Sequence, residues 1–213
     1  LATNAVSEKP ALAKRSAKAR SGPVRIMSPP RPALRQFFRS RCSIEATSDR
    51  LFCWGNGYSG QLGLGTATSV ESPTVVATQR WSAIAAGVAH TCGISGGTAY
   101  CWGDNYDGEL GNNSMMTSSS TPVAVGADAR VETGGSHTCG IDVSGMAACW
   151  GLGYWGQLGT GTYESERRPS PLSGSWQTID LGASFTCGIA SDRSLSCWGS
   201  NSSGQLGLDD TAS

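Results

Sequence analysis

The chain has 213 residues, of which 38% are hydrophobic and 15% are charged, and its formal charge at pH 7 is zero. This neutrality combines a basic segment, residues 1–41 with ten Lys/Arg and one acid, with an acidic remainder, residues 42–213 with six Arg and fifteen Asp/Glu. No apolar run is long enough to span a bilayer, so we expect no membrane segment in this chain.

Residues 1–41 form a basic leader that we expect to be disordered, because low hydrophobicity with high charge does not support a core. Its Arg, Ser and Ala content, with Glu8 as the single acid, also resembles an organelle transit peptide. It lacks the apolar core of a secretory signal peptide. A contact of the leader with nucleic acid or an acidic membrane is a less specific alternative, and we find no other nucleic-acid signal.

From residue 42 onward the sequence repeats itself. Cys-Trp-Gly occurs four times at intervals of 48 residues, and each copy is followed by Gly-Gln-Leu-Gly or Gly-Glu-Leu-Gly. Such intervals are typical of repeat folds, in which each unit buries its apolar face against the next one. We therefore expect a repeat domain, 42–213, with units at 42–91, 92–138 and 139–186 and a partial unit at 187–213.

Each repeat contains a predicted β-hairpin between two cysteines. In residues 90–103 two strand-like runs flank Gly96-Gly97, a pair typical of two-residue hairpin loops. Antiparallel pairing around this loop sets Cys92 opposite Cys101, with Cβ atoms about 4.5–5.5 Å apart, which is near disulfide distance. The same arithmetic gives four pairs: Cys42–Cys53, Cys92–Cys101, Cys139–Cys149 and Cys187–Cys197.

The spacing leaves the chemical state of these cysteines open. Four disulfides are favoured, and they indicate an oxidising or extracellular compartment, whereas the leader favours organelle targeting. Pairs of buried, reduced thiols are the main alternative. Zinc fits poorly, because the cysteines are nine to eleven residues apart and His90 and His137 have no counterparts in the other repeats. We expect no metal and no cofactor.

The rest of each repeat predicts further strands. The repeat tryptophans alternate with the cysteines, so we expect them in the layer between neighbouring units. They are Trp54, Trp102, Trp150 and Trp198. A short strand is expected ahead of each hairpin, around Ile84, Val131 and Ile179, and prolines mark the loops before it, at Pro73, Pro122 and Pro171. With three or four strands per 48 residues, each unit is interpreted as one blade of an all-β propeller.

The pattern G-x-x-[HF]-[ST]-C-[GS]-[IL], followed by C-W-G-x-[NG]-x-x-G-[QE]-L-G, resembles the regulator of chromosome condensation (RCC1) repeat. The resemblance covers residues 42–213, and the cysteine-paired form is similar to secreted bacterial members and to the ectodomain repeats of Crinkly-type receptor kinases. It implies a β-propeller of seven blades, of which these residues would supply three full repeats and part of a fourth, as a fragment of a ring.

We expect no catalytic residue, because residues that recur in every repeat usually serve the architecture and no common catalytic motif is present. His90 and His137 are interpreted as structural hydrogen-bonding residues. A shared fold does not determine the activity. The favoured hypothesis is a non-enzymatic protein–protein interaction module. The alternatives are a guanine-nucleotide exchange factor-like regulator of a small GTPase, and an ectodomain-type recognition module of a larger receptor.

Four aromatic residues are the candidate partner-binding site: Tyr58, Tyr106, Tyr154 and Trp155. The three tyrosines each lie four residues after a repeat tryptophan, so a propeller places them on one face. Exposed Tyr and Trp side chains are frequent interaction hot spots. Asp104, Asp107 and Glu109 are expected as solvated charges around them, which would favour a basic partner. The alternative is that the tyrosines only cap the blade edges.

Overall fold

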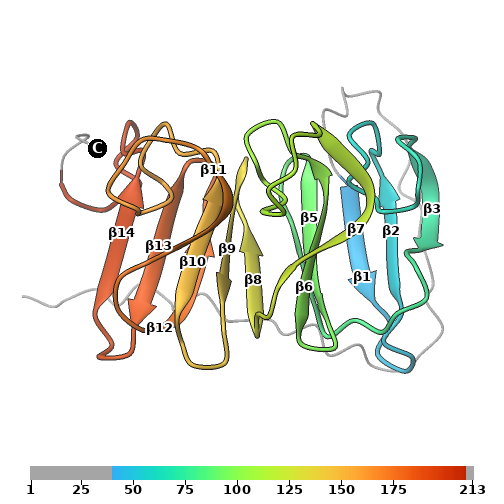
Figure 1. The fold of residues 1–213 in the computed structure, drawn as a ribbon, viewed down its shortest axis with the longest axis horizontal. Helices are drawn as coiled ribbons and strands as arrows, with labels where there is room; N and C mark the ends of the chain where they lie inside the picture. Colours follow the sequence, from blue (N-terminus) through green and yellow to red (C-terminus); the bar gives the residue numbers. More distant parts are fainter. Residues whose placement is uncertain (1–39, 210–213) are drawn as a thin grey trace, which may run out of the picture. The chain divides into compact units, whose positions relative to one another are not determined.

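The computed structural model describes residues 40–209, and every regular element in this range is a β-strand (Figure 1). The strands form four antiparallel sheets, which we call blades 1 to 4. Over these residues no helix is long and apolar enough to cross a bilayer. Residues 1–39 lie outside the described residues, so the expectation that the basic leader is disordered stays a prediction.

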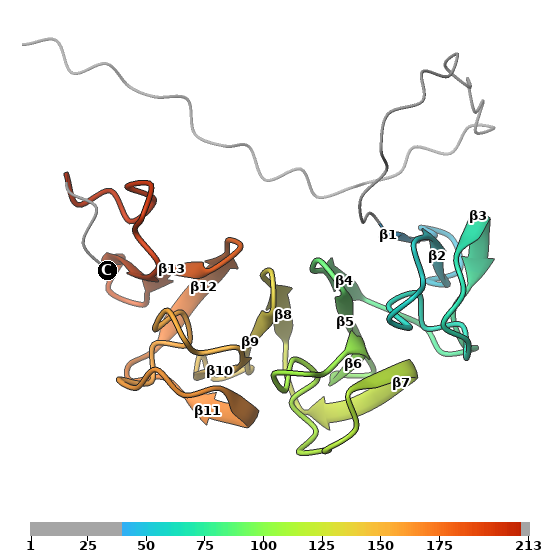
Figure 2. The same ribbon diagram turned by 90° about the horizontal axis from the view of Figure 1, so that it is seen from above.

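The blades follow one another in chain order, and within each blade every strand pairs with the strand next to it in sequence (Figure 2). Blade 1 contains β1 (Ser40–Ile44), β2 (Leu51–Gly55) and β3 (Val70–Val75). Blade 2 contains β4 (Ala83–Ala86), β5 (His90–Ser95), β6 (Thr98–Asp104) and β7 (Ser118–Gly126). Blade 3 contains β8 (Arg130–Thr133), β9 (His137–Ile141), β10 (Ala147–Gly151) and β11 (Glu166–Pro171). Blade 4 contains β12 (Trp176–Leu181), β13 (Phe185–Ala190) and β14 (Leu195–Gly199).

The cysteine hairpins are confirmed. Gly96 and Gly97 join β5 to β6 with φ values of 58° and 76°, which a tight hairpin turn requires and which glycine adopts without strain. Cys92 lies directly opposite Cys101 in the β5–β6 ladder. All four predicted disulfides are formed, with Cα–Cα distances of 4.1–4.2 Å, and no cysteine of the described residues is free.

The core lies largely between the blades, where the repeat tryptophans were predicted. Trp102 of blade 2 packs with Leu51, Cys53 and Leu62 of blade 1, and Trp150 of blade 3 packs into the core of blade 2. Both indoles are 0% exposed. Because each tryptophan fills the space beside the preceding sheet, neighbouring blades share one apolar layer.

The short strand ahead of each hairpin is also confirmed, since Ile84, Val131 and Ile179 lie in β4, β8 and β12. In contrast, the interpretation of three prolines as loop markers is wrong: Pro73, Pro122 and Pro171 belong to the outermost strands β3, β7 and β11. An outermost strand has one unpaired edge, where a residue without an N–H group breaks no ladder. The ladder also shifts register opposite Pro73 and Pro122, which accommodates them.

The sheets are out of phase with the sequence repeats. The repeat boundary at 91/92 falls inside β5 and that at 138/139 falls inside β9, whereas the chain passes from one sheet to the next at 76–82, 127–129 and 172–175. Each of the three full sequence units therefore contributes strands to two blades, so that the repeat in sequence and the blade in space are different segments of the chain.

Candidate functional site

Successive blades are joined through a main-chain carbonyl in the loop that follows each Cys-Trp-Gly strand. These carbonyls belong to Gln61, Glu109 and Gln157. Each accepts a tryptophan indole N–H at 2.8–3.0 Å and a threonine hydroxyl at 2.8–2.9 Å, both from the following blade. The donors are Thr91 with Trp102, Thr138 with Trp150, and Thr186 with Trp198. We call each such arrangement an interblade joint, and it anchors a loop to the next blade.

Two buried histidines extend the joints. His90 Nε2 lies 3.0 Å from Thr138 Oγ1, and His137 Nε2 lies 2.9 Å from Thr186 Oγ1. Because each threonine donates its hydroxyl proton to a carbonyl, the histidine must be the donor. Burial, with His137 nearby, lowers the pKa of His90 to about 3, and burial lowers the pKa of His137 to about 4. Both are therefore neutral at pH 7 and serve as interblade hydrogen-bond donors, as interpreted from the sequence.

Glu109 is buried, with 1% of its surface exposed, so the expectation of a solvated charge at this position is wrong. Its Oε2 accepts the backbone N–H of Asp107 at 3.0 Å, in the same way that Gln61 Oε1 accepts the N–H of Ser59. Burial, together with the smaller effect of the nearby Asp104 and Asp107 charges, raises the pKa of Glu109 to about 7. Its side chain holds the loop from inside rather than surrounding an exposed surface.

The substitution Glu109→Gln is expected to raise the free energy of unfolding at pH 8 by up to about 3 kcal/mol and to leave it nearly unchanged at pH 4. The folded-state pKa of about 7 lies above the ordinary value of 4.5, so ionisation of Glu109 destabilises the fold increasingly as the pH rises from 4.5 to 7. Urea denaturation at both pH values measures the difference. Glu164→Gln, an exposed loop position, is the control. Equal stability of the Glu109 variant and the parent at pH 8 would contradict the conclusion that burial disfavours the ionised form of Glu109.

The candidate partner-binding residues lie in loops at one end of the blades, which we call the loop face (Figure 1). The loop face consists of residues 56–69, 105–117, 152–165 and 200–209, which follow β2, β6, β10 and β14. The aromatic set is strongly exposed: 74% for Tyr58, 70% for Tyr106, 66% for Tyr154 and 54% for Trp155. Asp104 and Asp107 are half-buried beside Tyr106, and burial, together with Asp104, raises the pKa of Asp107.

The loop that carries Tyr106 is held by internal hydrogen bonds. The buried Asn105 side chain donates to the carbonyls of Ser114 and Met116, at 3.4 and 2.8 Å, and accepts the N–H of Leu110 at 3.0 Å. Asn201 of blade 4 accepts the N–H of Leu206 in the same manner at 2.9 Å. In blades 2 and 4 the asparagine of the repeat pattern thus closes the loop, and in blade 2 it directly precedes the exposed Tyr106.

Arg167, on β11 of blade 3, ties the same loop from outside. Its guanidinium donates to the carbonyls of Asn105, Tyr106 and Ser114 at 3.2, 2.8 and 3.3 Å. Arg167 was not predicted from the sequence; its signal there is the Arg167-Arg168 pair, in a segment that contains only six arginines and no lysine. Because the contact runs from one blade to the loop of the preceding one, it could be recognised only once the blades are aligned.

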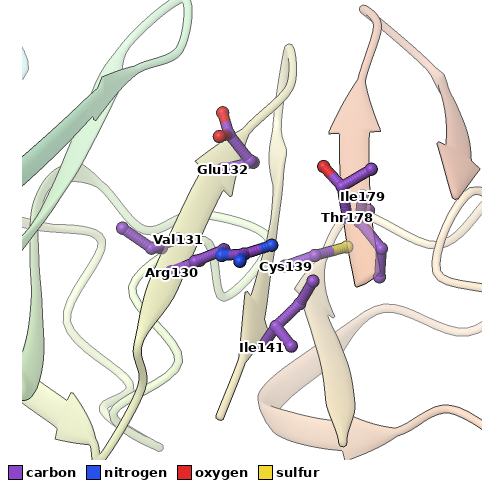
Figure 3. Close-up of a pocket in the computed structure, with 7 residues that line it drawn as sticks. All are labelled: Arg130, Val131, Glu132, Cys139, Ile141, Thr178 and Ile179. Atoms are coloured by element: carbon purple, nitrogen blue, oxygen red, sulfur yellow. The ribbon is translucent and has the colours of Figure 1, made fainter. Parts of the chain in front are cut away.

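A small cavity between β8, β9 and β12 does not provide a ligand site (Figure 3). Its volume is about 20 Å³, enough for about one water molecule. Arg130, at its edge, donates to the carbonyl of Gln177 on β12, so this contact also joins two blades. The lining residues are Arg130, Val131, Glu132, Cys139, Ile141, Thr178 and Ile179.

Comparison with protein families identifies the regulator of chromosome condensation (RCC1) repeat. One model of this repeat matches residues 48–94 and 145–189, and a second matches residues 176–205. Together they cover about half of the chain. A comparison of the sequence with curated proteins gives no match.

Solved structures share the fold at low sequence identity. Human WBSCR16 is 22% identical, with a TM-score of 0.69 over 77% of this chain and 46% of that one. Prp20p from Saccharomyces cerevisiae, described with its binding properties to Gsp1p and histones, is 21% identical, with a TM-score of 0.60 over 65% and 39%. Yeast RCC1 (Prp20) bound to Kap60 is 17% identical, with a TM-score of 0.64 over 75% and 42%. The chain spans less than half the length of these proteins, and the likeness establishes a β-propeller fold.

Proposed function

From the premise that this chain belongs to the regulator of chromosome condensation (RCC1) repeat family, we propose that it is a non-enzymatic protein–protein interaction module. In this proposal residues 42–213 form the module and residues 1–41 form a separate basic leader. The loop face is the binding surface, and Tyr58, Tyr106, Tyr154 and Trp155 are its contact residues.

The observation that carries the proposal is the contrast between two kinds of aromatic side chain in the same repeat. Trp102 and Trp150 are 0% exposed in the core, whereas Tyr106 and Tyr154, four residues further on, are 70% and 66% exposed. Large exposed aromatic groups contribute little to folding, but they bury 150–250 Å² each when a partner covers them. The exposed tyrosine that lies four residues after the tryptophan in the first three repeats therefore favours a role in binding.

The loops are also built to present these side chains without a large ordering cost. The hydrogen bonds of Asn105 and Arg167 fix the loop around Tyr106, and the interblade joints fix one main-chain carbonyl inside each of three loops. A surface that is already ordered loses less conformational entropy on binding, which favours affinity. This rigidity supports a recognition role for the loop face.

The charge of residues 42–213, with fifteen acids and six arginines, favours a basic partner. Asp104 and Asp107 lie beside Tyr106 and supply local negative charge, although Glu109 no longer belongs to this set because it is buried. Charges at the rim of an interface act mainly on the association rate and are screened by salt. Association is therefore expected to weaken as the ionic strength rises.

A guanine-nucleotide exchange factor-like role is the second candidate. The observation in its favour is the shared fold with Prp20p, whose structure is described with binding to Gsp1p. Stable capture of a nucleotide-free small GTPase, released by added nucleotide, would support this role. A third candidate, an ectodomain-type recognition module, agrees with the four disulfides but has no further observation in its favour.

Replacing Tyr106, Tyr154 and Trp155 together by serine is expected to abolish partner capture and to leave the melting temperature within a few degrees of the parent. The reason is that all three side chains are more than half exposed and belong to none of the three core clusters. Affinity capture with quantitative mass spectrometry, together with calorimetry, measures both effects.

The matched control replaces three exposed apolar residues at the opposite end of the blades by serine: Val143, Met146 and Leu195. This variant should retain every partner that the parent captures. If the loop-face variant also retains them, the aromatic set is not the binding surface. If its melting temperature falls sharply instead, the tyrosines belong to the fold.

A further inference from the structure

Arg167 occupies a defined place relative to the loop of the preceding blade. The carbonyl of Arg167 accepts the N–H of Asn113 at 2.9 Å, and its backbone passes so close to Gly108 that a Cβ there would lie 2.8 Å from Arg167 Cα. From this place its guanidinium reaches the carbonyls of Asn105, Tyr106 and Ser114. The guanidinium is thus hydrogen-bonded to three main-chain oxygens of the loop, and its charge also acts on the Asp107 carboxyl group of that loop.

Ser120 occupies the same place one blade earlier. Its carbonyl accepts the N–H of Gly65 at 2.8 Å, and a Cβ on Gly60 would lie 2.8 Å from Ser120 Cα. The loop 56–69 therefore packs on Ser120 as the loop 105–117 packs on Arg167. A serine side chain is too short to reach the loop carbonyls that the guanidinium of Arg167 reaches.

A cavity of about 390 Å³ lies at Ser120. Its lining includes Ser59, Gly60 and Ala67 of the blade 1 loop and Asn112 and Met116 of the blade 2 loop. No lining residue is charged. Its volume is in the range of small-ligand sites, about 300–1,000 Å³.

We propose that this cavity receives an arginine side chain of a protein partner, at the place that Arg167 fills from within the chain in the next blade. The proposal rests on the proposed function and names the chemistry of the partner. Alignment of the two loops, Gly65 with Asn113, makes the carbonyls of Gly57, Tyr58 and Thr66 the counterparts of the three that Arg167 engages. These three residues do not line the cavity themselves, but they lie within two positions of lining residues of the same loop, Ser59 and Ala67.

Arginine fits this place better than lysine or a neutral group. A planar guanidinium has five N–H donors and can serve several carbonyls at once, whereas an ammonium group is a compact, strongly hydrated point charge. The serines and asparagine around the cavity add further acceptors. Tyr58, at 74% exposure, lies next in sequence to Ser59 of the cavity wall, so an arginine entering here would pass the aromatic set.

The direct experiment titrates the full chain with N-acetyl-arginine methylamide and follows backbone amide resonances. The amide resonances of Gly60, Gly65 and Ser120 are expected to shift. The neutral isostere, with citrulline in place of arginine, should bind at least about tenfold more weakly than the arginine probe. Equal binding of the two probes would overturn the proposal in favour of a neutral ligand. Absence of any shift would overturn it outright.

Two variants locate the site. Ser120→Arg should occupy the guanidinium site from within the chain, abolish the probe-induced shifts and raise the melting temperature. Arg167→Ser should create a second responsive set at Gly108 and Asn113. Retained shifts at Gly60 and Gly65 in the Ser120 variant would contradict the proposal.

Partner capture separates this inference from the proposed function. Under the proposal, Ser120→Arg also weakens capture. If that variant captures partners normally while the loop-face variant does not, the loop face is an interaction surface without an arginine pocket. If the probe binds at Ser120 but neither variant changes capture, the pocket exists and the proposed function is wrong.

Discussion

Reduction of the four disulfides is expected to lower the melting temperature by about 20 °C or more. Each bridge closes a loop of nine to eleven residues, and the chain-entropy model assigns about 2–3 kcal/mol to each such loop. The four together are comparable to the whole stability of an ordinary domain, about 5–15 kcal/mol. Calorimetry with and without a phosphine reductant measures the difference, and alkylated, unfolded protein provides the reference for complete reduction.

Replacing a single bridge gives a sharper form of the same experiment. Cys139→Ser with Cys149→Ser removes the bridge of blade 3, whose sulfurs are buried beside Ile141 and Ala147. The expected loss is about 2–3 kcal/mol of unfolding free energy.

A non-reducing peptide map of the parent should recover only links within hairpins. Links between different repeats would contradict the observed register, and free thiols throughout the isolated protein would indicate a reducing compartment.

The substitution Trp150→Ala is expected to cost about 3–5 kcal/mol of unfolding free energy. Trp150 is 0% exposed, packs in the core of blade 2, and donates its indole N–H to the Glu109 carbonyl at 2.8 Å. Its loss empties a large volume and leaves that carbonyl with Thr138 as its remaining interblade donor. Denaturant unfolding measures the loss.

Trp155→Ala is the matched control, because it removes the same side chain five residues away at a position that is 54% exposed. It should cost about 0.5 kcal/mol or less. Trp150→Phe should lie between the two, since it keeps much of the packing and loses the hydrogen bond. Equal losses for Trp150→Ala and Trp155→Ala would contradict the assignment of Trp150 to the interblade core.

Features with a local cause could be predicted from the sequence. The Gly96-Gly97 turn determines the register of its hairpin, and this register brings Cys92 opposite Cys101. The alternation of side chains along a strand then separates Trp102 from Cys101. Each step depends on residues within about ten positions, where spacing and backbone geometry are sufficient.

Features that depend on neighbouring blades could not be predicted in this way. From the sequence Glu109 is expected as a solvated loop charge, but it is buried in a loop whose main chain binds the next blade. Pro122 is expected in a loop, but it lies in the outermost strand of its sheet. Arg167 lies more than fifty residues from the carbonyls that it binds. Of the candidate site, the aromatic positions follow from the repeat phase, but the contacts that hold their loops do not.

The interblade joints have a consequence for how such a chain can diversify. Because the acceptor at each joint is a main-chain oxygen, the side chain at that position can change without loss of the link, as Gln61 and Glu109 illustrate. The donors, an indole and a hydroxyl, must stay. A duplicated repeat can therefore acquire new loop residues, and with them new ligands, while it still fits beside its neighbour.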